Sequence, residues 1–260
     1  MSIVEALTLA LIQGLTEFLP ISSSGHLILT PVLFGWPDQG LGFDIAVHLG
    51  TLGAVVVYFR RDLVAMARGV LVADSPDGRL GRQLLLASVP LGLAGYLSAD
   101  LVATTLRTPA VIAAASAGFG ILLFAADRWR RGSLGERELG LGQVMLIGLG
   151  QVLALIPGTS RSGITMTVAL WLGLSREAAG RFSFLLAIPA IGMAAVYQIV
   201  QFARAPETLD WQALVLATAV AAATALVAVA LFLRLIGKIG MGVFAVYRIL
   251  LAAVILYALA

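Results

Sequence analysis

The sequence predicts an all-α integral membrane protein with six transmembrane helices and two re-entrant helical hairpins in an inverted-topology repeat. Three observations lead to this fold class. The chain of 260 residues is 60% hydrophobic and 12% charged, with a mean hydropathy of +1.00, which lies outside the range of soluble domains. Six apolar stretches are long enough to cross about 30 Å of hydrocarbon as helices. Two further apolar regions are interrupted by Pro, Gly and Ser in a similar way.

Composition also excludes several classes of protein. No Arg or Lys precedes residue 60 and no small-residue cleavage site follows the first apolar run, so a removable signal peptide is not expected. The absence of cysteine excludes disulfides, thiolate chemistry and thiolate metal sites. In a membrane protein, an arginine excess reflects cytoplasmic loops and anionic lipid headgroups, so membrane lipid and not nucleic acid is the expected partner.

The six uninterrupted stretches are expected to be the transmembrane helices. They cover residues 43–59, 83–100, 110–126, 182–200, 212–233 and 243–260.

The loops between these stretches indicate their orientation. Segment 60–82 carries five arginines and segment 127–138 carries four, Arg128, Arg130, Arg131 and Arg137, whereas 101–109 and 201–211 carry one each. The positive-inside rule therefore predicts that 60–82 and 127–138 are cytoplasmic and that both termini lie outside.

The interrupted regions, 3–35 and 141–174, fit straight spans poorly. Backbone that leaves the helix at membrane depth must be buried in protein or line a polar cavity. We therefore expect each region to form a re-entrant hairpin. Given the orientation above, the first hairpin enters from the outer face and the second from the cytoplasmic face, and the two meet near the midplane.

The two interrupted regions resemble each other in sequence. A shift of 138 residues places Gln13 on Gln151 and segment 22–25 on segment 160–163, and a shift of 139 continues the match as far as Tyr58 and Tyr197. Each half then contains one hairpin and three spans. Because three is odd, the second copy is inverted, which is the plan that builds midplane sites from interrupted helices.

This repeat sets the predicted domain organisation. The whole chain, 1–260, is expected to form a single membrane domain. Its halves are 1–126 and 141–260, and the charged segment 127–140 joins them.

The first hairpin contains the stretch "QGLTEFLPISSSGH", residues 13–26. Gln13 and Glu17 are spaced i, i+4 and share one helix face. A carboxylate at membrane depth costs about 3 kcal/mol, so Glu17 is expected to face a polar cavity; the alternative is that it lies near a wet hairpin end. Serines after Pro20 can cap the next helix. Capping explains one serine, but not three followed by His26.

The second hairpin contains "PGTSRSGITMT". Arg161 lies there with no acidic residue between Glu138 and Glu177. A Gly-rich turn at a helix N-terminus adds backbone N–H groups and the positive end of the helix dipole, and a guanidinium suits phosphate oxygens. The alternative is that Arg161 forms a structural ion pair with Glu17. Both possibilities place the two hairpins in contact.

Together these groups fit phosphoryl transfer, which needs anion stabilisation and an activated nucleophile. His26 could instead be a core histidine, but its neighbours Ser23 and Glu17 favour chemistry. His48 lies inside a span without such neighbours, so we expect a core position. Tyr247 and Arg248 either face the cavity or hold a helix end, and the sequence does not decide between these roles.

These residues resemble a known family. The (E/Q)xxxE motif followed by SSxGH, and the later PGxSRSxxT motif, are similar to the two signature regions of the bacterial undecaprenyl-diphosphate phosphatase, or bacitracin-resistance, family. The resemblance includes "FSFLLAIPA" at 182–190 and "FAVYR" at 244–248. It implies a multi-pass enzyme of the bacterial inner membrane, open to the periplasm, that hydrolyses undecaprenyl diphosphate and recycles the lipid carrier for peptidoglycan synthesis.

The resemblance also implies roles for residues. Glu17 is the catalytic or metal-associated carboxylate, Ser23 the nucleophile, and His26 an acid/base or alternative nucleophile. Arg161 takes part in catalysis and holds the diphosphate, and the further diphosphate-binding residues are Ser22, Ser24, Gly25, Ser160, Ser162, Gly163 and Thr165. A divalent cation, Mg²⁺ or Ca²⁺, would lie at Glu17 and Gln13. Gln13 replaces a glutamate found in many members, which weakens a site held by two carboxylates.

Two other functions share part of this pattern. A transporter or flippase of an isoprenoid lipid phosphate would use the same architecture and Arg161, but it does not require the Glu, Ser and His set. The type 2 phosphatidic acid phosphatase family needs a later histidine, and none follows His48. A homodimer is possible, and the sequence does not set the oligomeric state.

Overall fold

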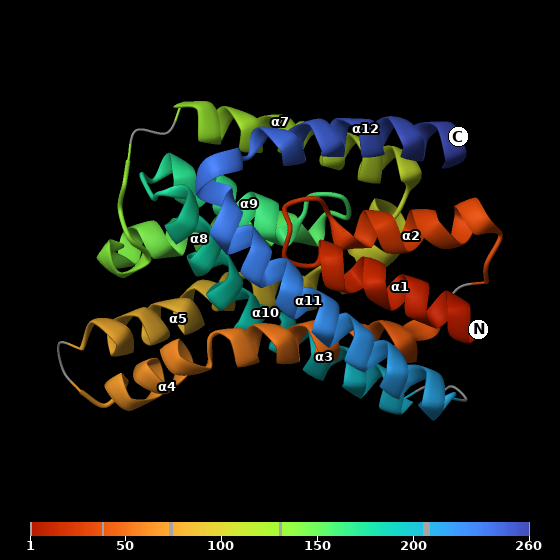
Figure 1. Cartoon of the computed structure of the whole chain (residues 1–260), viewed down its shortest axis with the longest axis horizontal. Coiled ribbons are helices and arrows are strands. Elements are labelled where there is room, and N and C mark those ends of the chain that lie inside the picture. Colours follow the sequence, from red (N-terminus) through yellow and green to blue (C-terminus); the bar gives the residue numbers. More distant parts are fainter. Residues whose placement is uncertain (1, 38, 73–74, 130–131, 205–208, 260) are drawn as a thin grey trace.

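The computed structural model describes residues 2–37, 39–72, 75–129, 132–204 and 209–259, and these are almost entirely helical (Figure 1). Arg130 and Arg131, which entered the orientation prediction, lie outside the described residues. One isolated bridge joins Leu134 and Leu174. The helices are α1 (Ile3–Thr16), α2 (Ser23–Phe34), α3 (Gly40–Tyr58), α4 (Arg60–Gly69), α5 (Pro76–Leu97), α6 (Ala99–Leu101), the π-helical η1 (Val102–Leu106), α7 (Pro109–Trp129), the 3₁₀ turn η2 (Glu136–Glu138), α8 (Leu141–Val152), the 3₁₀ turn η3 (Leu153–Leu155), α9 (Arg161–Trp171), α10 (Arg176–Arg204), α11 (Trp211–Ile239) and α12 (Gly242–Leu259).

Several of these helices can cross a membrane. By length and composition, α3, α7, α10 and α11 qualify, and α5 does so when taken with the bent segment that follows it. Shorter apolar helices include α1, α2, α8 and α12. Each of the six predicted stretches falls mainly in one helix, namely α3, α5, α7, α10, α11 or α12. The all-helical class and the presence of several helices that are long and apolar enough to cross a membrane are thus confirmed.

The two interrupted regions share one local conformation. Helix α2 begins after Ser22, with φ 72°, and helix α9 begins after Ser160, with φ 67°. Among the described residues these are the only non-glycine residues with positive φ, a conformation that costs about 1–3 kcal/mol for residues with a side chain. Each serine hydroxyl also lies 3.2 Å from the hydroxyl two residues later, at Ser24 or Ser162. The chain accepts the same strain at both interruptions.

Glycines and aromatic rings hold the helices around these interruptions. Helix α1 packs on α11 and α8 packs on α5. A Cβ at Gly14 would lie 2.7 Å from the Ala221 carbonyl oxygen, and one at Gly148 would lie 2.4 Å from that of Ala87, so these contacts need glycine. Phe18, directly after Glu17, is fully buried and meets Phe184 of α10 edge-on. The end of α1 is thereby fixed against α10.

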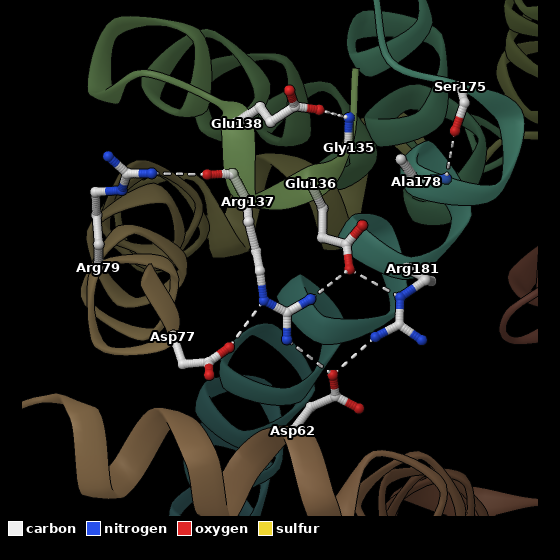
Figure 2. Close-up of polar contacts among 10 residues, drawn as sticks. All are labelled: Asp62, Asp77, Arg79, Gly135, Glu136, Arg137, Glu138, Ser175, Ala178 and Arg181. Carbon is white, nitrogen blue, oxygen red and sulfur yellow. Dashed lines mark hydrogen bonds and ion pairs between the residues drawn. The ribbon is translucent and has the colours of Figure 1, made fainter. Parts of the chain in front are cut away.

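At one end of the molecule, five charged side chains form a network (Figure 2). Arg137 of η2 donates to Asp77 at 2.8 Å, to Glu136 at 3.1 Å and to Asp62 at 3.3 Å. Arg181 of α10 donates to Glu136 at 2.8 Å and to Asp62 at 2.7 Å. Burial lowers the pKa of Arg137, but hydrogen bonds and attraction from Asp77, Asp62 and Glu136 outweigh it and raise the pKa above its ordinary value. The guanidinium therefore stays charged and ties the connecting segment to α4, α5 and α10.

This end is opposite to the chain termini. In Figure 1, α1 begins and α12 ends at the right, whereas α4 and the start of α5 lie at the left. The interruption between α1 and α2 lies in the middle of the long axis.

The network leads to a prediction about stability. Glu136 is 8% exposed and accepts hydrogen bonds from both arginines. Glu136→Ala therefore removes one anionic partner from Arg137 and from Arg181. We expect a loss of about 2–4 kcal/mol in the free energy of unfolding, measured as a lower midpoint of thermal unfolding in detergent. Arg61→Ala, an exposed arginine on the same helix as Asp62, is the control and should change the midpoint little. Equal midpoints for the two variants would contradict a stabilising network.

Candidate active site

A cavity of about 260 Å³ lies between the two interruptions and α3, α5 and α10. One part of its wall is polar and the other is apolar. The polar part contains Glu17, Ser22, Ser23, Ser24, His48, Ser160 and Arg161 together with Gln198, and the apolar part contains Leu91, Ala154, Leu155, Ala190, Ile191, Ala194 and Ala195. Residues 144 positions apart in the chain thus share one chamber.

Glu17 is the centre of the polar wall. Its Oε2 accepts from Gln13 Nε2 and from Ser23 Oγ, each at 2.9 Å. Its Oε1 lies 3.4 Å from Arg161 Nη2. The carboxylate is only 9% exposed, and such a buried charge needs both a counter-charge and hydrogen bonds. The ion pair considered for Arg161 therefore exists, and the pair also lines the cavity.

Arg161 is held in place from several sides. It is the first residue of α9, and its Nη1 donates to the Ser183 carbonyl oxygen at 3.3 Å. The guanidinium carbon lies 6.0 Å from the centre of the Phe18 ring. With the N-terminus of α9 beside it, this position combines a fixed cation with the positive end of a helix dipole, which suits an anion.

Several residues predicted to bind diphosphate lie behind the cavity wall instead. Ser162 donates to the Leu19 carbonyl oxygen at 2.9 Å and joins the two interruptions. Thr165 Oγ1 lies 2.7 Å from Ser183 Oγ. A Cβ at Gly163 would lie 2.7 Å from Arg248 Nη1. These three residues, and Gly25, are not among the residues that line the cavity, and their diphosphate-binding role stays a prediction.

The two histidines differ in their relation to the cavity. His26, expected beside Ser23 and Glu17, uses both ring nitrogens elsewhere: Nδ1 lies 2.8 Å from the Ser22 carbonyl oxygen, Nε2 lies 2.5 Å from Tyr247 Oη, and the ring stacks on Tyr247. His48, expected in the core, lines the cavity with Nε2 at 3.7 Å from Glu17 Oε2. The core prediction for His48 was wrong, because the face of α3 that carries it packs toward the site and not toward a neighbouring helix.

The structure decides the role of the Tyr247–Arg248 pair, which the sequence left open. Arg248 is fully buried. Its Nη2 donates to the carbonyl oxygens of Thr159 at 2.7 Å and Gly158 at 3.0 Å, and its Nε donates to that of Ser116 at 2.9 Å. Arg248 therefore holds the turn before α9, while Tyr247 holds His26 at the start of α2. One turn of α12 supports both interruptions.

The side chains fit poorly as a metal site on their own. Gln13 turns its N–H toward Glu17, so it serves the carboxylate as a donor, and both Glu17 oxygens are already engaged. Among the residues that the structure describes, no group of three or more His, Asp or Glu side chains could hold an ion. The expected Mg²⁺ or Ca²⁺ stays a prediction.

Sequence reasoning did not assign three residues to the site. Besides His48, these are Ser183, which contacts both Arg161 and Thr165, and Gln198, which lines the cavity from α10. For His48 and Gln198 a signal was present, because polar side chains inside apolar spans usually face a cavity or the bundle interior.

Comparisons with known proteins agree with this arrangement. The family model described as bacitracin resistance protein BacA matches residues 6–254. A relative from Nitrosococcus oceani, named undecaprenyl-diphosphatase, is 48% identical over 99% of both chains. Relatives with the same name from Teredinibacter turnerae and Alcanivorax borkumensis are also 48% identical, over 99% and 98% of this chain and 100% and 98% of their own. The chain belongs to the BacA family of bacitracin resistance proteins.

Proposed function

We propose that this chain hydrolyses undecaprenyl diphosphate to undecaprenyl phosphate and inorganic phosphate, in agreement with the name undecaprenyl-diphosphatase that its relatives carry. This reaction recycles the lipid carrier for peptidoglycan synthesis and supports bacitracin resistance. The observation that carries the proposal is the contact of one carboxylate, Glu17, with a serine hydroxyl, Ser23, and a guanidinium, Arg161, in one cavity. Anion binding alone would not need the hydroxyl held against a carboxylate.

The first chemical step uses these three groups. Glu17 takes the proton of Ser23, and the Ser23 oxygen forms a bond to the terminal phosphorus. The bond from that phosphorus to the bridging oxygen breaks, and undecaprenyl phosphate leaves with the electron pair. Arg161 and the N-termini of α2 and α9 stabilise the charge on the transferred group. Glu17 pairs with Arg161 before substrate binds, so the diphosphate takes over a cation that is already in position.

The apolar wall fits the lipid part of the substrate. Small residues of α10, Ala190, Ala194 and Ala195, lie next to the polar groups. A cavity of about 260 Å³ has room for a headgroup and the start of a chain but not for the polyprenyl tail, which we place in the surrounding bilayer.

We further propose that the chain is an inverted repeat with halves 1–126 and 141–260. The shared positive φ of Ser22 and Ser160, and of Gly35 and Gly173, at the same offset of 138 residues supports it. The packing of the helices supports it as well. Helix α1 contacts α11, and its counterpart α8 contacts α5, which is the counterpart of α11. Likewise α2 contacts α12, and its counterpart α9 contacts α7, the counterpart of α12.

We place the enzyme in the inner membrane with the termini and the cavity mouth on the periplasmic side. The basic loops at the α4 end favour this orientation. The cavity is lined by Leu91 and Gln198, which lie in the second halves of α5 and α10. Those halves lead away from the α4 end, so the cavity extends toward the opposite face.

The nucleophile is tested by Ser23→Ala in purified protein. We expect phosphate release from undecaprenyl diphosphate to fall by about 1,000-fold or more, because no other hydroxyl contacts Glu17 among the described residues. Ser98→Ala, which removes a hydroxyl that bonds the Ala94 carbonyl oxygen far along α5, is the control and should be as active as the wild type. Near-normal turnover of Ser23→Ala would remove serine as the nucleophile.

The orientation is tested with single cysteines, since the chain has none of its own. Thr105 and Arg68 are both exposed, and they lie on either side of α5 in the chain, Arg68 in α4 before it and Thr105 in η1 after it. In intact spheroplasts, a membrane-impermeant maleimide should label Thr105→Cys, and it should label Arg68→Cys only after permeabilisation. The reverse pattern would place the cavity mouth on the cytoplasmic side.

The activity itself is tested by phosphate release from undecaprenyl diphosphate by the wild type, with and without a chelator. Release confirms a phosphatase, and its loss with chelator supports the expected divalent cation. No release in the presence of Mg²⁺ or Ca²⁺ would favour the transporter.

A further inference from the structure

The ring of His48 is fixed in one tautomer. Its Nδ1 lies 2.7 Å from the carbonyl oxygen of Asp44, one helical turn earlier in α3. A carbonyl oxygen only accepts, so Nδ1 carries the hydrogen and donates it. In the neutral ring, Nε2 then carries the lone pair. The hydrogen bond from Nδ1 to the backbone determines the direction in which this lone pair points.

That lone pair lies beside the reacting groups. Nε2 is 3.7 Å from Glu17 Oε2, which is too far for a hydrogen bond. With a neutral ring, two acceptors face each other there, and Oε2 already accepts from Gln13 and Ser23. The space between His48 Nε2 and Glu17 Oε2 therefore suits a molecule that donates hydrogen bonds. The His48 side chain is 28% exposed and lines the cavity, so water can reach it.

His26 offers no such acceptor. Its Nδ1 is hydrogen-bonded to the Ser22 carbonyl oxygen and its Nε2 to the Tyr247 hydroxyl. The chain has two histidines, so the imidazole lone pair in the cavity belongs to His48.

We propose that His48 positions the water that hydrolyses the phosphoserine at Ser23 by accepting a hydrogen bond at Nε2. The inference rests on the proposed function and concerns its second step. The water oxygen forms a bond to phosphorus and passes one proton to a phosphoryl oxygen. The bond from phosphorus to Ser23 Oγ breaks, and its electron pair stays on Oγ. Oγ then takes the proton that Glu17 gained in the first step. The products are free serine, dihydrogen phosphate and the Glu17 carboxylate.

The need for a separate positioning group follows from the role of Glu17. After the first step Glu17 holds the serine proton and must return it to the leaving Oγ, so it cannot also orient the attacking water. Arg161 only donates hydrogen bonds. His48 Nε2 and Ser23 Oγ both lie close to the same oxygen, Glu17 Oε2, so a water on His48 would be next to a phosphoryl group on Ser23.

The experiment follows both steps with undecaprenyl diphosphate radiolabelled on the terminal phosphate. In His48→Ala, undecaprenyl phosphate should form in a burst of about one equivalent per enzyme. Steady-state phosphate release should fall about 10- to 100-fold, and label should stay on the protein. KM should not rise, because substrate binding is untouched.

Two conservative variants separate positioning from packing. His48→Gln places an amide oxygen near the position of Nε2 and should keep turnover within about threefold of the wild type, whereas His48→Asn is too short and should behave like His48→Ala. Leu49→Ala, on the neighbouring exposed side chain of α3, is the control for folding and should be as active as the wild type.

Other outcomes would overturn the inference. Equal activities for His48→Gln and His48→Asn would exclude an acceptor at Nε2, and a slow His48→Ala without labelled protein would place the defect in the first step. If the wild type releases no phosphate, the proposed function fails, and this inference fails with it.

Discussion

The structure depends on the requirement that backbone leaving a helix inside an apolar protein must find partners for its polar groups. The chain breaks two helices, before Ser23 and before Arg161, and each break leaves N–H and carbonyl groups without helical partners. Helix α12 supports both breaks: Arg248 donates to the carbonyl oxygens of Gly158 and Thr159, and Tyr247 contacts His26, which in turn bonds the carbonyl oxygen of Ser22. Without this support, the positive φ of Ser22 and Ser160 would relax into ordinary helix or loop.

The same breaks account for the site. They bring two helix N-termini and their polar side chains to the interior, where a lone charge would be costly. Glu17 from one break and Arg161 from the other compensate each other, so each buried charge has its counter-charge in the other half of the chain. Phe18 and Ser183 fix the pair from the side. The contacts that stabilise the two breaks therefore also place a carboxylate, a hydroxyl and a cation within reach of one phosphate.

Much of this arrangement could be predicted from the sequence. The apolar stretches, the two interruptions and the meeting of Glu17 with Arg161 follow from hydropathy, from Pro, Gly and Ser positions, and from the cost of buried charge. The place of His48 inside an apolar span indicated a cavity position, but which cavity it faces depends on the rotation of α3 about its axis, and side-chain packing sets that rotation. The contact of His26 with Tyr247 depends in the same way on how α2 and α12 pack against each other. The carbonyl partners of Arg248 were equally hidden, since backbone acceptors leave no mark in a sequence. The network around Glu136 joins residues from four segments, and only the tertiary fold brings them together.

The central claim is that the carboxylate of one interruption and the guanidinium of the other work as one site. The most direct test is a double-mutant cycle on kcat/KM for phosphate release, with Glu17→Gln, Arg161→Gln and the double variant. If the two groups act together on the same transferred phosphoryl group, the loss in the double variant should be close to that of the more damaged single variant. Losses that multiply would show that Glu17 and Arg161 act independently, and would contradict the account.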